Sequence, residues 1–183
     1  MKKIAILFSG QGSNFEYIAK NLHKKKLLIS VALTNNPNAG GIEVAKRYNI
    51  PLIIIPSKGR EREEFDKKVV NALNDYKFDL VVLAGFMRIL TPIFTQNLKA
   101  INLHPSLLPR HKGLHAIERS FKDEYQEGGV SVHYVTSKLD SGEIIVQKSI
   151  NKNSLDFNDY YNKIRAIEKE ALSEAILKVL EIK

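Results

Sequence analysis

The stretch that decides the fold spans residues 4–14 and reads Ile-Ala-Ile-Leu-Phe-Ser-Gly-Gln-Gly-Ser-Asn. Residues 4–8 are apolar without interruption, which predicts a strand that is buried on both faces. The glycines that follow allow the backbone to turn sharply, and Ser13 or Asn14 suits the cap of a helix. A buried strand that turns at once into a helix is typical of a parallel α/β sheet.

The remainder of the first half repeats this alternation of apolar runs and amphipathic stretches. We predict further strands at residues 28–33, 52–55 and 80–84, and helices at residues 14–25, 42–48 and 61–76. Strands that alternate with helices and are apolar on both faces indicate parallel pairing. The predicted fold class is therefore α/β, a Rossmann-like open, mostly parallel twisted sheet with helices on both faces.

The second half has a different pattern. Residues 100–103 predict a short strand, and two prolines then enforce a loop through Arg110. We predict a helix at 113–121 and strands at 130–135 and 144–150. A long amphipathic helix closes the chain, with one face formed by Phe157, Tyr161, Ile164, Ala171, Ala175 and Val179. Without repeats or a linker, residues 1–183 are expected to form a single domain.

Composition narrows the classes of function. The chain has 183 residues, about one domain, and no apolar run approaches the roughly 18 residues that span a membrane. It has no cysteine, which excludes disulfides and thiol nucleophiles. The formal charge of +8 is spread over predicted helix faces and helix ends, which indicates mostly solvated side chains; steering of anionic small molecules is the functional alternative. We expect a cytoplasmic monomer or homodimer with small-molecule substrates and no membrane partner.

The glycine-containing turn of residues 9–14 is the first candidate binding motif. Backbone N–H groups at a helix N-terminus favour an anion. A dinucleotide fingerprint would need a third glycine at position 15, where this chain has Phe15, and an acidic residue after the second strand, where residues 34–36 are uncharged. The motif therefore favours a single phosphate. A tight turn that is only capped by Ser13 or Asn14 is the alternative.

Asn102 and His104 form the second candidate. Their period-two spacing puts both side chains on one side of an extended segment, at the end of a predicted strand. An amide can donate to a developing oxyanion, and an imidazole can transfer a proton near neutral pH. On these residues alone, the polar start of a loop is the favoured interpretation.

Asp140 lies in the tight-turn sequence Asp-Ser-Gly before an apolar strand. It is a turn residue unless its loop reaches His104, in which case we expect the carboxylate to orient the ring and raise the pKa of the imidazole. Glu168 borders the apolar face of the last helix, either as a residue at the edge of the core or as a carboxylate that binds a sugar hydroxyl. His133 is open between a structural role and a site role. His111 and His115 lack an accompanying carboxylate, and no metal site is expected.

Taken together, these motifs closely resemble the phosphoribosylglycinamide formyltransferase family. Five blocks carry the resemblance in order along nearly the whole chain. They are Ser-Gly-Gln-Gly-Ser-Asn at 9–14, Leu-Ala-Gly-Phe-Met-Arg-Ile-Leu at 83–90, Ile-Asn-Leu-His-Pro-Ser-Leu-Leu-Pro at 101–109, Val-Ser-Val-His-Tyr-Val at 130–135 and Leu-Asp-Ser-Gly at 139–142.

The resemblance implies a reaction and roles for named residues. The family transfers a formyl group from 10-formyltetrahydrofolate, a co-substrate, to the glycine amine of glycinamide ribonucleotide in purine biosynthesis, without a metal. It implies that the catalytic residues are Asn102, His104 and Asp140. The implied ligands of the ribonucleotide and its phosphate are Gly12, Ser13, Asn14 and Glu168, the last in a segment that starts at Arg165. The implied folate-binding residues are Arg62, Met87, Arg88, Ile89, Leu90 and Asn102.

Three alternatives share part of this pattern. Methionyl-tRNA formyltransferase carries a second, nucleic-acid-binding domain, for which no residues remain here. Formyltetrahydrofolate deformylase, a hydrolase, normally has an N-terminal regulatory domain, whereas the first strand here is expected to begin at residue 3. A nucleotide-binding module without catalysis would make the three catalytic residues a coincidence. Two departures from relatives are the end of the chain at Lys183 and Lys112-Gly113 in place of Pro-Gly, where the lysine would help to bind anions.

Overall fold

The chain folds into two compact units. The computed structural model describes all of residues 1–183 and divides them into residues 1–102 with Ile182, and residues 103–181 with Lys183. That the two units work as the single domain expected from the sequence stays a prediction.

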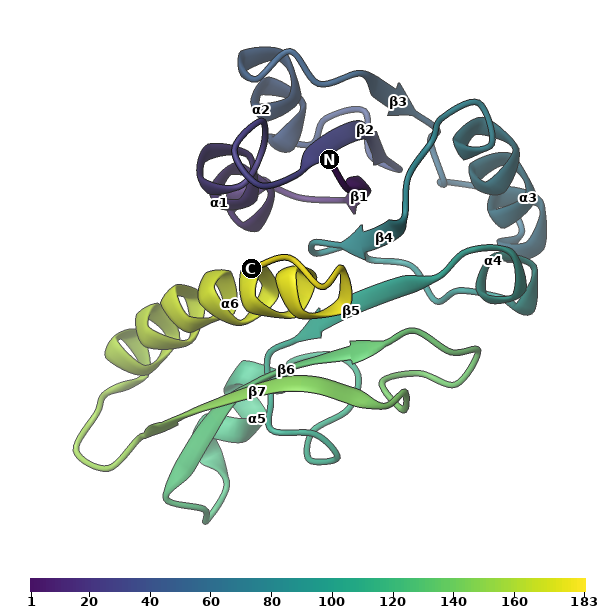
Figure 1. Cartoon of the computed structure of the whole chain (residues 1–183). Helices are drawn as coiled ribbons and strands as arrows, with labels where there is room; N and C mark the ends of the chain where they lie inside the picture. Colours follow the sequence, from purple (N-terminus) through teal and green to yellow (C-terminus); the bar gives the residue numbers. More distant parts are fainter. The chain divides into compact units, whose positions relative to one another are not determined.

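The first unit is built around parallel strands (Figure 1). Its strands lie in the order β3-β2-β1-β4-β5, and the four pairings between them are all parallel. Parallel strands place their carboxyl ends at one edge of the sheet, where ligands of open α/β sheets bind. The strands are β1 (Lys3–Phe8), β2 (Leu28–Thr34), β3 (Leu52–Ile54), β4 (Leu80–Leu83) and β5 (Ala100–His104), whose last two residues belong to the second unit.

Helices flank the strands of the first unit on both sides (Figure 1). Helix α1 packs against α2, and α3 packs against α4. The central strands are buried on both faces; every residue of 4–8 and of 80–83 is at most 3% exposed, as the apolar runs predict. The helices are α1 (Ser13–Asn21), α2 (Gly41–Arg47), α3 (Arg62–Leu73) and α4 (Pro92–Asn97).

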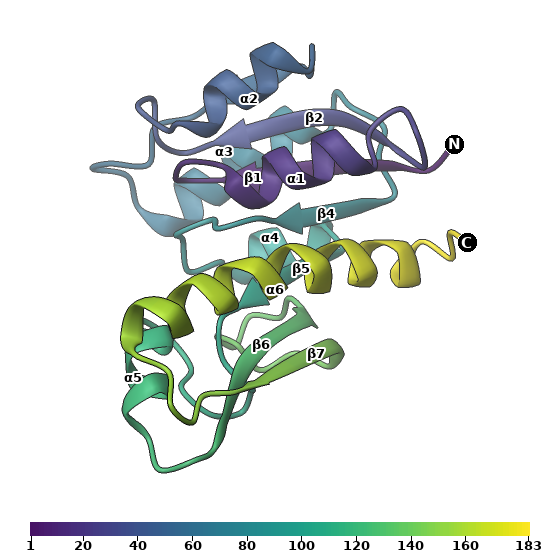
Figure 2. The same ribbon diagram turned by 90° about the vertical axis from the view of Figure 1, so that its left-hand side faces the viewer.

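The second unit consists of a hairpin and two helices (Figure 2). Strands β6 (Glu127–Tyr134) and β7 (Ile144–Asn151) pair antiparallel, with an irregularity between Val132 and His133. Helix α6 (Phe157–Val179) packs against both strands and against α5 (Ala116–Lys122). Asp156 caps α6, because its side chain accepts a hydrogen bond from the Asp159 N–H at 2.8 Å.

The predicted fold class is confirmed, because the sheet is open and mostly parallel and helices lie on both of its sides. Four boundaries differ from the predictions by three or four residues. Helix α3 ends at Leu73 instead of residue 76, and β6 begins at Glu127 instead of residue 130. Helix α1 ends at Asn21 instead of residue 25, since the backbone of Lys24 turns into the left-handed region at a φ of 59°. Helix α5 begins at Ala116 instead of residue 113, because His115 is left-handed as well.

The apolar face of the last helix was also predicted incorrectly at its first turn. Phe157 and Tyr161 are each 39% exposed, whereas Tyr160 is fully buried and shares a 2.9 Å hydrogen bond with the Ser120 hydroxyl. From Ile164 onward the predicted face is buried through Ala171 and Ala175, and Val179 at its end is half-buried. No helix has both the length and the apolar composition required to cross a membrane.

Candidate active site

The glycine-containing turn joins β1 to α1 in the first unit. Gly12 caps the helix with a left-handed φ of 79°, and a Cβ atom there would lie 2.7 Å from the Cα of Gly41. Both observations require glycine at this position. The loop is held against the start of α2 by a hydrogen bond from the Gly41 N–H to the Gly10 carbonyl at 3.1 Å. Gly12 and Ser13 are half-buried and Asn14 is buried at the first turn of α1.

A network around Ser9 connects the carboxyl ends of three strands. The Ser9 hydroxyl donates to Asn35 Oδ1 at 2.5 Å and accepts from the Met87 N–H at 2.8 Å. The Ser9 N–H donates to the Gly85 carbonyl at 3.0 Å, and Asn36 Nδ2 donates to the Ser9 carbonyl at 3.1 Å. The turn after β1 and the segment after β4 are therefore fixed to each other. Sequence reasoning did not assign this role to Ser9, although a small hydroxyl at a strand end was a signal for it.

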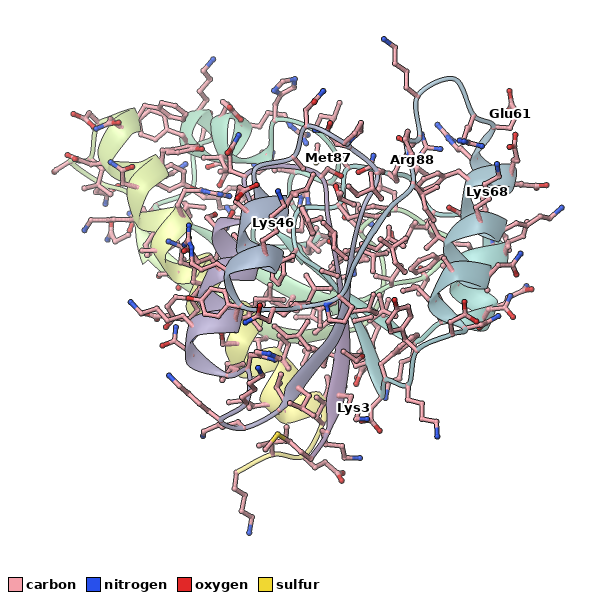
Figure 3. All side chains as sticks on the ribbon, turned by 90° about the horizontal axis from the view of Figure 1, so that it is seen from above. Lys3, Lys46, Glu61, Lys68, Met87 and Arg88 are labelled. Carbon is pink, nitrogen blue, oxygen red and sulfur yellow. The ribbon has the colours of Figure 1, made fainter.

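The segment of residues 87–90 presents apolar side chains on a fixed backbone. Met87 is 66% exposed and Ile89 is 45% exposed, whereas Leu90 is buried. Figure 3 labels Met87 and the neighbouring Arg88, whose guanidinium carbon lies 4.7 Å from the centre of the Phe65 ring. Two exposed apolar side chains beside a cation suit a flat, partly polar ligand.

Asp66 and Arg62, both on α3, are the other residues of interest near the segment of residues 87–90. The buried carboxylate of Asp66 accepts from both the backbone N–H and the hydroxyl of Thr91, each at 2.7 Å, which fixes the end of the segment. Sequence reasoning overlooked Asp66. Arg62 is exposed as the first residue of α3, and α3 adjoins the segment through Phe65, which stacks on Phe86 at 6.3 Å between ring centres.

His104 lies at the centre of a buried cluster of polar groups in the second unit. Its ring is 7% exposed, and its Nε2 lies 2.7 Å from the His111 carbonyl. A carbonyl can only accept, so Nε2 carries the hydrogen and Nδ1 is the nitrogen that gains or loses a proton. Nδ1 lies 3.4 Å from Asp140 Oδ2. The loop of Asp140 therefore reaches His104, which was the condition for Asp140 to be more than a turn residue.

Asp140 is held from three directions. Its Oδ2 accepts from the Gly113 N–H at 2.9 Å, and its other oxygen, Oδ1, lies 3.6 Å from Nε2 of His133. Burial raises the pKa of the Asp140 carboxyl, but the contacts with His133, Gly113 and His104 outweigh burial and leave this pKa below its ordinary value. The group is therefore a carboxylate at neutral pH.

The pKa of His104 shifts in the direction opposite to our expectation. Burial of the ring lowers this pKa, and the hydrogen bond to the His111 carbonyl and the charge of Asp140 raise it only in part. The net result is a pKa below the ordinary 6.5, so the ring is mainly neutral at neutral pH. A neutral ring with its free electron pair on Nδ1 can accept a proton.

His133 contacts the same carboxylate. Its Nδ1 donates to the Tyr134 carbonyl at 2.8 Å, which turns Nε2 toward Asp140. The ring is 4% exposed. The sequence left His133 open between two roles, and the structure positions it as a second imidazole on Asp140.

Three further residues, Asn102, Glu168 and Lys112, were expected from the sequence to contribute to catalysis or binding. Asn102 precedes His104 by two residues in β5 and is half-buried. Glu168 is 2% exposed on α6 and accepts from Arg165 Nη1 at 2.7 Å. Lys112 reaches the loop of Asp140 through a 2.8 Å hydrogen bond to the Ser141 hydroxyl. That all these residues serve one site stays a prediction. No group of three or more acidic or histidine side chains is arranged to hold a metal ion.

Comparison with known proteins identifies the family. Residues 2–176 match the formyl transferase family. The chain is 38% identical to phosphoribosylglycinamide formyltransferase of Haemophilus influenzae over 155 residues, which cover 82% of this chain and 73% of the relative. The enzyme of that name from Escherichia coli is also 38% identical, over 80% of this chain and 72% of its own length. The crystal structure of phosphoribosylglycinamide formyltransferase from Campylobacter jejuni superposes with a TM-score of 0.95 at 45% identity and covers 98% of this chain and 97% of its own. The chain belongs to the formyl transferase family.

Proposed function

We propose that this chain transfers the formyl group of 10-formyltetrahydrofolate to the glycine amine of N1-(5-phospho-D-ribosyl)glycinamide. The products are the N-formyl ribonucleotide and tetrahydrofolate, in the de novo pathway to purines. Similarity over most of the chain to relatives named phosphoribosylglycinamide formyltransferase supports the reaction. The observation that carries the chemistry is the buried pair of His104 and Asp140, with Nδ1 of the ring at 3.4 Å from the carboxylate.

The proposed reaction uses the neutral form of the His104 ring, in which Nδ1 can accept a proton. The substrate amine attacks the formyl carbon, and the new C–N bond leaves an oxyanion to which the amide of Asn102 donates. Neutral His104 accepts the proton of the attacking amine on Nδ1, and the carboxylate of Asp140 stabilises the resulting imidazolium. His104 and Asn102 together stabilise the oxyanion until Nδ1 passes the proton to the folate nitrogen. The bond from that nitrogen to the formyl carbon then breaks, and tetrahydrofolate leaves.

The binding residues have separate roles in this proposal. Gly12, Ser13 and Asn14 contribute the turn that holds the phosphate, because a left-handed glycine at a helix N-terminus exposes N–H groups to an anion. Glu168 binds a hydroxyl of the ribose. The folate lies against Met87, Arg88, Ile89 and Leu90, with Arg62 and Asn102 as further ligands.

The remaining parts of the proposal concern the setting of the reaction. The formyl folate is a co-substrate, and the mechanism requires neither a metal nor a covalent intermediate. Residues 1–183 act as one formyltransferase domain, as a monomer or homodimer, in the cytoplasm. Neither nucleic acid nor a membrane is a partner.

A direct assay tests the reaction. Release of tetrahydrofolate is measured with 10-formyltetrahydrofolate, with and without the ribonucleotide acceptor, and the formylated product is identified by mass. We expect release that depends on the acceptor and matches the product in amount. Release at the same rate without the acceptor would identify a hydrolase and contradict the proposal, and no release in either case would leave only a binding protein.

A further inference from the structure

A second cluster of charged side chains lies next to His104 in the second unit. Its centre is the carboxylate of Asp123, which follows α5. His111 Nε2 lies 2.6 Å from Asp123 Oδ2, Lys152 Nζ lies 2.5 Å from Asp123 Oδ1, and Arg110 Nη1 lies 3.6 Å from Asp123 Oδ2. The proposed mechanism uses none of these four side chains.

The backbone of His111 needs an explanation. Its φ of 55° is left-handed, a conformation that residues other than glycine rarely adopt without a local reason. In this conformation the His111 carbonyl is the group that meets His104 Nε2 at 2.7 Å. The side chain of His111 is bound to Asp123 at the same time. One residue therefore connects the charged cluster to the ring that reacts.

We propose that His111 is a positioning residue for the formyl transfer. Its side chain, anchored on Asp123, holds its own carbonyl against Nε2 of His104 and thereby leaves Nδ1 as the nitrogen that exchanges a proton. The proposal rests on the proposed function for its kinetic consequence, but the fixed tautomer of His104 is a property of the free protein.

The anchor itself is firmly held. Lys152 is 8% exposed, and its ammonium group donates to the Asp123 carbonyl at 3.0 Å and to the Ser120 carbonyl near the end of α5. Burial raises the pKa of Asp123, yet the hydrogen bonds from Lys152 and His111 outweigh burial and leave this pKa below its ordinary value. Asp123 therefore remains a carboxylate at neutral pH, able to accept from His111.

The loop has a separate support, so that loss of the His111 side chain is not expected to unfold it. Arg119 donates from Nε to the Leu114 carbonyl at 3.1 Å and from Nη2 to the Lys112 carbonyl. Lys112 also contacts the loop of Asp140 through Ser141. What the His111 side chain adds is the orientation of a single carbonyl.

The test compares three variants with the wild type. His111→Gly keeps a backbone that tolerates positive φ but removes the contact with Asp123. His111→Gln restores a donor, because the glutamine amide can donate to the carboxylate. His115→Gly is the matched control, since His115 has the same backbone conformation in the same loop and an exposed side chain.

Two readouts are recorded for each variant. Steady-state kinetics give kcat and the KM of both substrates. Long-range proton–nitrogen NMR of the free protein reports which ring nitrogen of His104 carries the hydrogen, with the signal assigned by its loss in His104→Gln. We expect His111→Gly to lose the fixed Nε2–H tautomer and to reduce kcat about tenfold, less than the roughly 100-fold that a 1 Å displacement in an active site can cause. KM should change little, His111→Gln should recover both properties in part, and His115→Gly should behave as wild type.

The proposal is overturned if His111→Gly keeps the Nε2–H tautomer, whatever happens to kcat, because the side chain then does not position the ring. It is also overturned if His111→Gln is as impaired as His111→Gly in both readouts. If His111→Gly does not fold, His111→Asn replaces it, since asparagine also tolerates positive φ and its shorter side chain does not reach Asp123. A wild type without formyl transfer would refute the function, and the tautomer of His104 would still decide the role of His111.

Discussion

Replacing Asp140 with asparagine removes the charge beside His104 and preserves the shape of the side chain. At the 3.4 Å that separates the two groups, a charge pair contributes about 5 kcal/mol at an effective dielectric constant of about 20. Because each ~1.4 kcal/mol is a factor of ten in rate, this sets an upper limit of roughly 10³- to 10⁴-fold. The amide retains a dipole near the ring, and we therefore expect kcat to fall by about 10² to 10³, in the range of a lost acid–base group.

The assay measures kcat with both substrates saturating, and histidine NMR measures the pKa of His104 in the free variant. The charge of Asp140 raises this pKa in the wild type, so the pKa should fall further in Asp140→Asn. Asp75→Asn, which neutralises an exposed carboxylate, is the control and should leave kcat unchanged. A folded Asp140→Asn protein with full activity would refute the role of the carboxylate.

Three further predictions concern stability. Gly12→Ala should lower the free energy of unfolding by about 1–3 kcal/mol, because it adds a Cβ in a crowded left-handed position. Gly10→Ala should change this free energy little, because its Cβ meets nothing within 4 Å. Urea denaturation measures both, and equal losses in the two variants would contradict the reasoning. Tyr160→Phe should lower the free energy of unfolding by about 1 kcal/mol because it removes a buried hydrogen bond, whereas Tyr161→Phe should lower it almost not at all. Thermal unfolding measures both variants, and equal stabilities would contradict the assignment. Because the pKa of Asp140 is lowered in the folded protein, its contribution is present above the ordinary value of 3.8 and is lost as pH falls through the folded-state value. Denaturation over a series of acidic pH values should therefore show a loss of stability that is smaller in Asp140→Asn, and an equal loss in the two proteins would refute it.

The elements with strong local patterns could be predicted from the sequence. The buried runs of β1 and β4 were placed to within a residue, and a long last helix was predicted from its periodic pattern; this helix begins at Phe157, where Asp156 caps it. Helix α4 was not predicted, since Phe94 is its one buried residue and so short a helix leaves no periodic pattern. At the first turn of α6, Tyr160 is buried instead of Tyr161 because its hydroxyl pairs with Ser120 on α5. No local sequence pattern reveals such a partner.

The sequence indicated His104 and Asp140 as candidates but not the electrostatics of the pair, and the catalytic role of these residues stays a prediction. A strand end and a glycine-containing turn made His104 and Asp140 only weak candidates, which the combination of motifs along the chain strengthened, and the structure brings them within 3.4 Å. The direction of the His104 pKa was missed, because burial of the ring depends on packing that neighbouring residues do not encode. The contact of His133 with the same carboxylate, and the anchor of His111 on Asp123, depend on pairs of residues distant in the sequence.

The group that fixes the His104 tautomer is a peptide carbonyl, and this limits what mutation can reach. No exchange of side chains deletes that acceptor, so a scan that replaces every residue in turn can displace the carbonyl but cannot remove it. Genetic variation can alter only how firmly the carbonyl is held, through position 111 and the residue on which it rests. Replacing the amide bond between residues 111 and 112 with an ester would weaken the acceptor and leave every side chain in place. Which ring nitrogen of His104 carries the hydrogen thus depends partly on the path of the main chain.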